Sequence, residues 1–293
     1  MTTSAAQTPV DSIEVQALSP AIGARVLGVD ASQALAPEVV NKLLDAWHAS
    51  GVLYLPGQTL DEAQQVRFGQ HFGELAATNA EYQISKSHPS IMYITNEKEN
   101  GKYIGALPDG EMYFHSDTCY VEKPSKATML YAMNVPKQGG NTLFANMYLA
   151  YEKLPADVRA RIDGRRAINS YEPGGSAPTA ATRMRDAGPA GSPGRREYSH
   201  PMVSTHPVTG RKSLYINRLM TEYIEGMPRA ESDELLDYLF NFQERPEFVY
   251  EHRWTPGDLL MWDNRCTLHA RTDFDAGELR KMRRITVKGD GIA

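Results

Sequence analysis

The sequence predicts a mainly β fold with α-helices packed outside the β core. From about residue 91 onward the chain consists largely of short segments rich in β-branched and aromatic residues, separated by turn signals. Two helical segments, about 147–163 and 230–244, interrupt them. Many short strands with few helices are typical of a β-sandwich or barrel. The strand-like segments are VLYL (52–55), IMYIT (91–95), FHSDTCY (114–120), KATMLYAMNV (126–135), NTLFAN (141–146), KSLYIN (212–217), FVYEHRW (248–254) and DLLMWD (258–263).

The N-terminal part predicts short strands followed by two helices. Residues 13–30 hold short apolar stretches broken by Pro and Gly, as in short opening strands. The segment 37–50, PEVVNKLLDAWHAS, has its apolar residues at amphipathic-helix spacing. Thr59 and Glu62 fit a capping box that opens a second helix, which continues to about His71.

Length and composition suit one large domain or two small ones, and we expect a single domain over residues 1–293. With 41% hydrophobic and 23% charged residues in 293, the chain can bury a sizeable core without metal or disulfide staples. Two cysteines are too few for a disulfide scaffold, which points to a reducing compartment. No apolar run reaches membrane-span length, and the start of the chain lacks signal-peptide features, so we expect a cytoplasmic protein with no membrane partner.

The charge of the chain argues against nucleic-acid binding. The formal net charge is −5, and no basic stripe of the kind that binds nucleic acid is present, so no nucleic-acid partner is expected.

The region of about 171–198, rich in Gly and Pro, has no periodicity and is predicted to be a long loop. Loops of that length are usually mobile lids or disordered segments, and we interpret this one as a lid.

A metal site is the most specific chemical hypothesis. On a β-strand, residues i and i+2 project to the same face, so His115 and Asp117 would converge on one point. His269, directly after DLLMWD, offers a third ligand. Two histidines and one carboxylate that leave other coordination positions open are typical of non-haem Fe(II) oxygenases.

Each of these residues also has a purely structural interpretation, and His-x-Asp spacing alone is weak evidence. His115 could be a hydrogen-bonded core histidine and Asp117 could cap the following turn. His269 could lie on the surface, where we also expect five other histidines, namely His48, His71, His88, His206 and His252.

Longer motifs favour the metal site, because they resemble a known family. The chain is similar to the taurine/2,4-dichlorophenoxyacetate dioxygenase family of 2-oxoglutarate-dependent oxygenases, over nearly its whole length. The resemblance rests on GVLYLPGQ, FGEL, HSD (115–117) followed by Thr118 and Tyr120, PKQGGNTLFAN, HPMVSTHPVTGRKSLYIN, WTPGDLLMWDNRCTLHA and RRITVKGD, in this order.

The resemblance implies a double-stranded β-helix, or jelly roll, and roles for particular residues. It implies that His115, Asp117 and His269 bind Fe(II), and that 2-oxoglutarate and O2 are co-substrates. By the same similarity, Thr142 binds a 2-oxoglutarate carboxylate and Arg280 pairs with the distal carboxylate. The site residues implied in this way also include Arg284, near the substrate's anionic group and the co-substrate.

Physical chemistry agrees with the arginine roles. A guanidinium offers a paired, always-charged fork to a carboxylate, where lysine offers a point charge. Arg280 and Arg284 are four apart, so strand alternation puts them on one face. Arg283 would point the other way, and we interpret it as a solvated surface charge.

The implied activity is oxidation of a substrate C–H bond with release of succinate and CO2. Related halogenases have a small residue in place of the carboxylate, so Asp117 favours hydroxylation. A same-fold oxygenase that performs desaturation or epimerisation would share all these residues and remains an alternative. A non-catalytic jelly-roll binding protein is a second alternative, but it predicts the loss of ligands that are present here.

The substrate is expected to be a small anion of aryloxyalkanoate or sulfonate-like type. The segment after FGEL has no histidine, which argues against taurine itself, and Asn79 or Tyr82 would face the pocket instead. Met220 stands where the taurine enzyme has a substrate-contacting phenylalanine, although ordinary core packing explains it equally well. Family members are commonly dimers or tetramers, so a homodimer or homotetramer is expected.

The segment before His115 supplies the remaining candidates. EKENGKYIGALPDGEMY has extra residues relative to the family, and its Tyr103, Ile104 and Gly105 are candidates for a wall of the substrate pocket.

Overall fold

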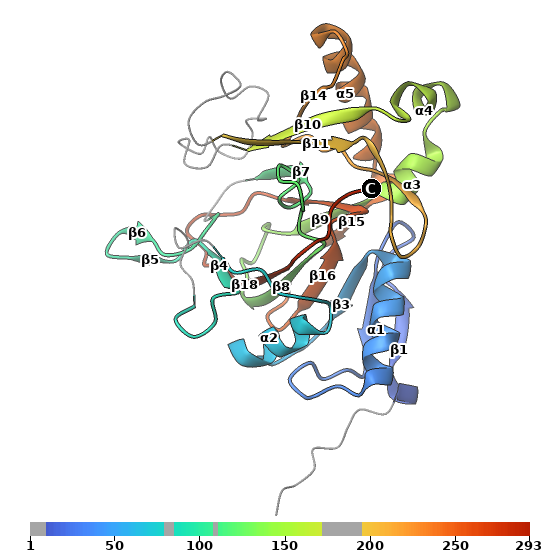
Figure 1. The fold of residues 1–293 in the computed structure, drawn as a ribbon. Coiled ribbons are helices and arrows are strands. Elements are labelled where there is room, and N and C mark those ends of the chain that lie inside the picture. Colours follow the sequence, from blue (N-terminus) through green and yellow to red (C-terminus); the bar gives the residue numbers. More distant parts are fainter. Residues whose placement is uncertain (1–9, 79–84, 108–110, 172–194) are drawn as a thin grey trace, which may run out of the picture.

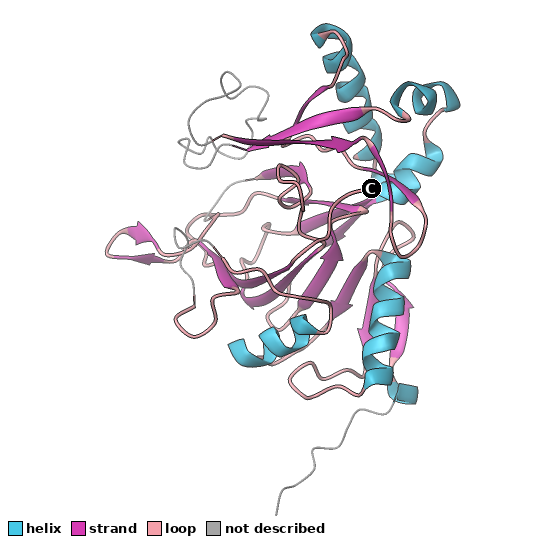
Figure 2. Cartoon of the chain, in the orientation of Figure 1, coloured by secondary structure: helices cyan, strands magenta, loops and turns pink. Residues whose placement is uncertain are grey.

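Two β-sheets form the centre of the molecule and pack face to face (Figures 1 and 2). The computed structural model describes residues 10–78, 85–107, 111–171 and 195–293. The larger sheet has seven strands, in the spatial order β1 (Glu14–Ala17), β2 (Ala24–Leu27), β3 (Val52–Leu55), β16 (Leu259–Asp263), β8 (Ala127–Asn134), β18 (Lys281–Val287) and β4 (Ile91–Thr95). The smaller has four, in the order β15 (Val249–His252), β9 (Thr142–Asn146), β17 (Thr267–Arg271) and β7 (Met112–His115).

Side-chain alternation divides the large sheet between two cores. Along β8, Met129 and Tyr131 belong to an outer hydrophobic cluster, while Leu130 and Ala132 belong to the cluster between the sheets. The inner cluster also contains Phe144 of the small sheet. This two-sheet arrangement is the predicted jelly roll, and its interior holds the candidate site.

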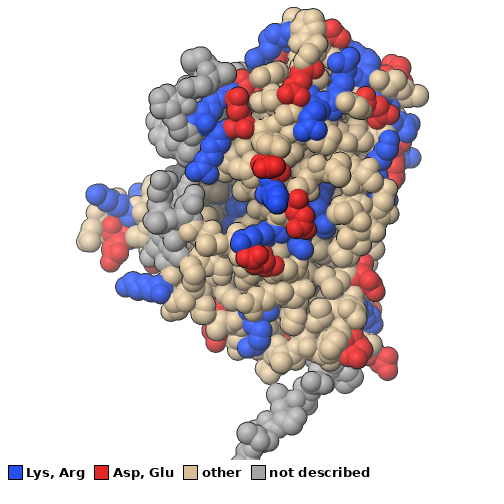
Figure 3. All heavy atoms as spheres, viewed as in Figure 1, with Lys and Arg blue, Asp and Glu red and all other residues tan. Residues whose placement is uncertain are grey.

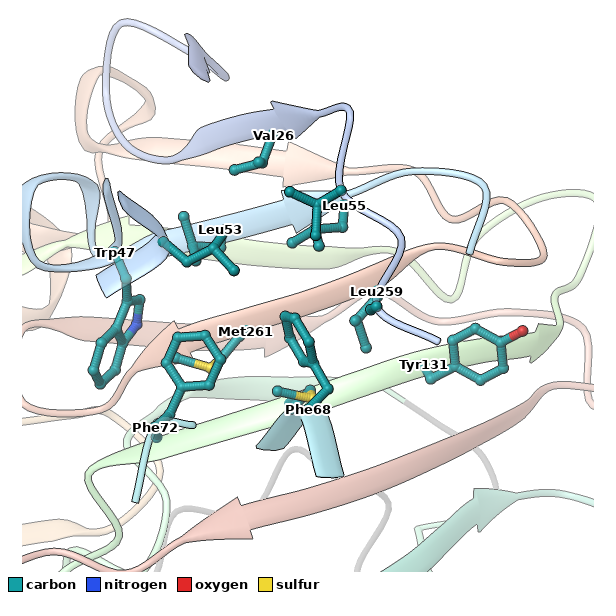
Figure 4. Close-up of a cluster of buried hydrophobic side chains, with 14 of the residues drawn as sticks. Val26, Trp47, Leu53, Leu55, Phe68, Phe72, Tyr131, Leu259 and Met261 are labelled. Carbon is teal, nitrogen blue, oxygen red and sulfur yellow. The ribbon is translucent and has the colours of Figure 1, made fainter. Parts of the chain in front are cut away.

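Helices α1 (Pro37–Ser50) and α2 (Glu62–Gln70) cover the outer face of the large sheet. Figure 4 shows Trp47 of α1 and Phe68 of α2 packed on this face beside Leu53 and Met261. The amphipathic spacing of 37–50 therefore predicted α1 with both ends correct, because its apolar stripe is buried against the sheet.

The outer face of the small sheet is covered by α3 (Met147–Lys153) and α5 (Arg229–Gln243). The remaining elements are η1 (Val10–Ser12), α4 (Ala156–Ile162), η3 (Pro246–Phe248), a sheet of β11 (Arg196–Pro201), β10 (Arg166–Tyr171) and β14 (Thr221–Ile224), and the hairpins β12 (Val203–Thr205) with β13 (Lys212–Leu214) and β5 (Lys98–Glu99) with β6 (Lys102–Tyr103).

Three local predictions need correction. The capping box of α2 is formed by Asp61 and Gln64, two residues after the predicted pair Thr59 and Glu62. The helix predicted over 147–163 is two helices, α3 and α4, because Pro155 cannot continue a helix. The bounds predicted for the lid loop, 171–198, are wrong at both ends, since Tyr171 belongs to β10 and β11 begins at Arg196. Residues 172–194 lie outside the described part of the chain.

Several charged or polar residues assigned to the surface are buried. Arg283 does face away from the site, but it is covered, donates a hydrogen bond to the Leu60 carbonyl and lies over the Tyr131 ring. His206 and His252 are also buried, each hydrogen-bonded to an aspartate. A buried polar side chain of this kind requires a partner that only the folded chain brings near.

Charges of both signs are interspersed over the face of the molecule shown in Figure 3. Among the described residues, no helix combines the length and hydropathy that a membrane crossing requires.

Candidate active site

Three residues far apart in the sequence meet because strands β7 and β17 pair. His115 is the last residue of β7, and Asp117 follows in the turn beyond it. His269 lies within β17, on a strand of its own and not directly after the preceding one as the sequence suggested. In the antiparallel register His269 stands directly opposite His115. The pairing of two strands therefore brings both imidazoles to one place.

The three side chains offer a compact set of ligand atoms. His115 Nε2 lies 3.9 Å from Asp117 Oδ1, and His269 Nε2 lies 3.9 Å from Asp117 Oδ2. One ligand atom from each residue lies within 4.8 Å of the others, and all three side chains are buried. Two imidazole nitrogens and a carboxylate that converge in this way fit a divalent transition metal.

The histidines are held in the form that binds metals. His115 Nδ1 lies 2.9 Å from the carbonyl oxygen of Tyr113, which can only accept, so Nδ1 carries the hydrogen and Nε2 has a free lone pair. Burial lowers the pKa of both His115 and His269, and the proximity of His115 lowers that of His269 further. Both rings are therefore neutral near pH 7, as ligands must be.

Asp117 is ionised despite its burial. Burial by itself raises the pKa of this carboxyl, but Arg284, His269 and His115 together hold it well below its usual range. The Arg284 guanidinium lies 2.8 Å from Oδ2, and the Thr128 hydroxyl donates to the same oxygen. These contacts orient the carboxylate toward the histidines.

The turn after Asp117 is strained. Thr118 has a φ of 56°, which is unusual for a β-branched residue and costs on the order of 1–3 kcal/mol. Its hydroxyl lies 2.7 Å from the Asp117 carbonyl and 2.9 Å from the Ser125 hydroxyl, and it accepts from the Ser125 amide at 2.8 Å. These hydrogen bonds hold the chain in the bend that carries Asp117 into the site.

A pocket extends from the two histidines into the space between the sheets. Cationic, polar and apolar side chains line this pocket. The lining residues are Ile94, Leu107, Met112, His115, Leu130, Thr142, Trp262, His269, Ala270, Arg271, Arg280 and Arg284. Thr142, Arg280 and Arg284 were expected together from the sequence, and the structure brings all three to this pocket.

Arg280 is a buried cation on the pocket wall. Only 3% of it is exposed, and its Nε donates to the Gly140 carbonyl at 3.2 Å. Among the described residues it forms no ion pair with a carboxylate, while burial and the nearby Arg271 lower its pKa to about 9. A buried charge without a counter-ion is unfavourable, so an anion in the pocket would stabilise it. Gly140, at φ +63°, permits the Arg280 side chain to lie against the backbone, because a Cβ at this position would lie only 3.2 Å from that side chain.

Sequence reasoning missed Arg271 and Leu107 as pocket residues. Arg271 lies two residues after His269 on β17, so the alternation that related His115 to Asp117 was a signal for it. Leu107 lies in the segment before His115, and its carbonyl accepts a hydrogen bond from Arg271 Nη1 at 2.8 Å. The two residues form a wall beside the histidines.

Of the substrate-binding candidates, Arg284 lines the pocket, whereas Tyr103, Ile104, Gly105 and Met220 do not. Tyr103, in β6, is 42% exposed, and it is absent from the pocket wall, as are Ile104 and Gly105. Gly105 instead permits close packing on β4, since a Cβ would lie 2.5 Å from Thr95. Met220 is buried, with its sulfur 3.5 Å from that of Cys119, and does not line the pocket. Two further candidates, Asn79 and Tyr82, lie outside the described residues.

Comparison with known families gives a match over residues 14–286 to the family described as "Taurine catabolism dioxygenase TauD, TfdA family". The chain belongs to this family. Its members include the alpha-ketoglutarate-dependent 2,4-dichlorophenoxyacetate dioxygenase of Cupriavidus pinatubonensis, to which the chain is 32% identical over 96% of its own length and 99% of that protein. It is also 34% identical to the (S)-phenoxypropionate/alpha-ketoglutarate-dioxygenase of Sphingobium herbicidovorans, over 84% of each chain.

Solved structures of this family have the same fold. A taurine dioxygenase from Burkholderia xenovorans superposes with a TM-score of 0.80 at 30% identity, covering 96% of this chain and 91% of that one. The structure of AAD-2 in complex with Mn(II) and N-oxalylglycine gives a TM-score of 0.77 at 29% identity, covering 96% and 98%. The protein is therefore a 2-oxoglutarate-dependent dioxygenase of the TauD/TfdA family that uses Fe(II), 2-oxoglutarate and O2.

Proposed function

We propose that His115, Asp117 and His269 bind the Fe(II) ion and that Thr142 and Arg280 bind the distal carboxylate of 2-oxoglutarate. The observation that carries this proposal is the single pocket that joins the two imidazoles to the buried guanidinium of Arg280. A dicarboxylate placed between a metal and an unpaired cation would neutralise both ends of this pocket.

The protein's own residues contribute positioning and charge. Bound Fe(II) supplies the redox chemistry by which O2 converts 2-oxoglutarate to succinate and CO2 and hydroxylates a substrate C–H bond. Neutral His115 and His269 and ionised Asp117 supply the ligand atoms. Apolar neighbours such as Leu130 and Trp262 exclude water from the pocket. No side chain is required as a general base.

For the substrate, we propose a small organic anion of aryloxyalkanoate or sulfonate-like type, with its charged group near Arg284. Two observations support this class. Arg284 lies on the pocket wall next to Asp117 and is therefore close to the reacting centre. The relatives named above act on 2,4-dichlorophenoxyacetate and (S)-phenoxypropionate, both aryloxyalkanoates.

Succinate formation tests this proposal. We expect 2-oxoglutarate to bind the Fe(II)-loaded protein without oxygen, and succinate release to increase with an aryloxyalkanoate or sulfonate from a substrate panel. Absence of 2-oxoglutarate binding to the iron-loaded protein would contradict the site. Mass spectrometry of the product distinguishes hydroxylation from desaturation or epimerisation, because the same metal and co-substrate residues serve all three outcomes.

We further propose a single catalytic domain that works as a homodimer or homotetramer in the cytoplasm. Cys119 and Cys266 are both free thiols, which suits a reducing compartment. Both sheets contribute to one pocket, which favours one folding unit. Light scattering after gel filtration would measure the assembly, and a monomeric mass would contradict it.

A further inference from the structure

Thr142 is hydrogen-bonded from behind by a tryptophan. Trp254, which follows β15 and is 9% exposed, donates its indole Nε1–H to Thr142 Oγ1 at 3.0 Å. An indole nitrogen can only donate, so the threonine oxygen is the acceptor of this bond. The single hydroxyl hydrogen of Thr142 must then be donated in another direction. Thr142 lines the pocket together with Arg280, where an anion would accept it.

The indole is itself held by a buried network outside the pocket. The His252 ring meets Trp254 edge-on, with centroids 4.8 Å apart. His252 Nε2 lies 3.0 Å from Asp258 Oδ2, and Tyr54 donates to Oδ1 of the same carboxylate at 3.0 Å. Tyr250 completes the set through its hydroxyl, 3.1 Å from His252 Nδ1. None of these four residues lines the pocket, so their contacts restrain Trp254 without touching a ligand.

The backbone places this network next to the co-substrate pocket. In the small sheet, Thr142 of β9 pairs with His252 of β15 on one side and with Arg271 of β17 on the other. Thr142 thus stands between the network and the cationic pocket wall. Its hydroxyl contacts Trp254 on one side, and the residue lines the pocket on the other.

We propose that Trp254 is a positioning residue for 2-oxoglutarate: its indole N–H occupies the Thr142 oxygen and so directs the threonine hydroxyl hydrogen to the distal carboxylate. This inference rests on the proposed co-substrate role of Thr142. A hydroxyl that already points at its partner loses less rotational freedom on binding, so the contact gains affinity by preorganisation.

The first test is Trp254→Phe, which keeps an aromatic ring and removes the N–H. The loss of one hydrogen bond of about 0.5–1.5 kcal/mol predicts a rise in the KM for 2-oxoglutarate of about two- to tenfold. We expect kcat at saturating co-substrate and the Fe(II) affinity to stay within twofold of the unsubstituted enzyme. Trp47→Phe is the matched control, since Trp47 is buried in α1 and its indole N–H has no hydrogen-bond partner among the described residues.

A double-mutant cycle with Thr142→Ala shows whether the indole acts through the hydroxyl. We expect Thr142→Ala to raise the same KM and Trp254→Phe to add nothing in that background. The affinity of the Mn(II)-loaded variants for N-oxalylglycine, measured by calorimetry, should change in parallel and does not depend on turnover.

The outcomes are distinguishable. If Thr142→Ala leaves both the KM and the N-oxalylglycine affinity unchanged, the proposed role of Thr142 is wrong. If Thr142→Ala weakens binding but Trp254→Phe does not, or if the two effects multiply in the double variant, the inference about Trp254 is overturned while the proposed co-substrate site stands.

Discussion

The guanidinium of Arg284 lies 2.8 Å from the Asp117 carboxylate, at the point where the two β-sheets face each other. Asp117 follows β7 of the small sheet, and Arg284 is on β18 of the large one. The contact therefore links the carboxylate that we propose as a metal ligand to the opposite wall of the pocket. It also places a permanent positive charge beside a site that must accept a divalent cation and an anionic co-substrate.

Replacement of Asp117 by Ala should remove both iron binding and activity. The substitution deletes one of the three proposed ligands and leaves Arg284 without its carboxylate, so the site becomes more positive. Loss of an outer-shell partner alone costs about 10- to 100-fold in metal affinity, so loss of a ligand should lower Fe(II) affinity at least about 100-fold and make turnover undetectable. Fe(II) titration and succinate assays measure both, and full turnover in this variant would remove Asp117 from the site.

Replacement of Arg284 by Gln should separate substrate binding from metal binding. A cation so close to Asp117 opposes a dication, so its removal should leave Fe(II) affinity at least as high as in the unsubstituted enzyme. The KM for an anionic substrate should rise about 10- to 100-fold, as expected for a lost charged hydrogen bond.

Lys281→Gln is the control for Arg284, because Lys281 is on the same strand but pairs with Glu97 outside the pocket. A marked loss of Fe(II) affinity in Arg284→Gln would instead show that this arginine serves mainly to hold Asp117.

Replacement of Arg280 by Ala should weaken 2-oxoglutarate binding with little effect on iron. We expect the KM for 2-oxoglutarate to rise about 10- to 100-fold, because a charge-assisted hydrogen bond is worth about 1.5–3 kcal/mol. Unchanged co-substrate dependence would show that another group binds the distal carboxylate.

Replacement of Arg280 by Lys should make co-substrate binding sensitive to pH. Burial and Arg271 lower the pKa of Arg280 to about 9, and a lysine there starts from a lower ordinary pKa of about 10.4. Because the cationic form binds the dicarboxylate, affinity falls as pH rises through the pKa of that cation. The KM of Arg280→Lys should therefore begin to rise at a lower pH than that of the unsubstituted enzyme, as KM profiles at increasing pH would show.

Replacement of Asp263 by Asn should destabilise the fold. Asp263 accepts hydrogen bonds from Arg265 and from His206, and all three side chains are buried between β16 and the β12–β13 hairpin. Removal of one partner leaves a buried charge uncompensated, at a cost of about 3–5 kcal/mol.

Urea unfolding measures this cost, and Asp233→Asn is the matched control. Asp233 pairs with Arg229 on the exposed surface of α5, where an i,i+4 ion pair contributes at most about 0.5 kcal/mol. Equal effects of the two substitutions would contradict the importance of the buried cluster.

The sequence alone determined the local elements and the family. Periodicity located α1 and the strands β3 and β4 at their observed bounds. An element with one buried face has apolar residues that recur about every 3.6 residues in a helix and every 2 residues in a strand. It also related His115 to Asp117 and Arg280 to Arg284, since each pair lies within a few positions of one strand.

The tertiary structure decided what depends on distant partners. The meeting of His269 with His115 requires the pairing of β7 with β17. The Trp254–Thr142 hydrogen bond joins a residue of β9 to one that follows β15, and the pairing of these two strands brings them together. Likewise, Arg283 alternates as predicted yet is buried, because the chain before α2 covers that face. Strand alternation can be recognised from neighbouring residues. Strand register, the burial of a surface by another segment and the walls of a cavity depend on packing between segments that have no fixed separation in sequence.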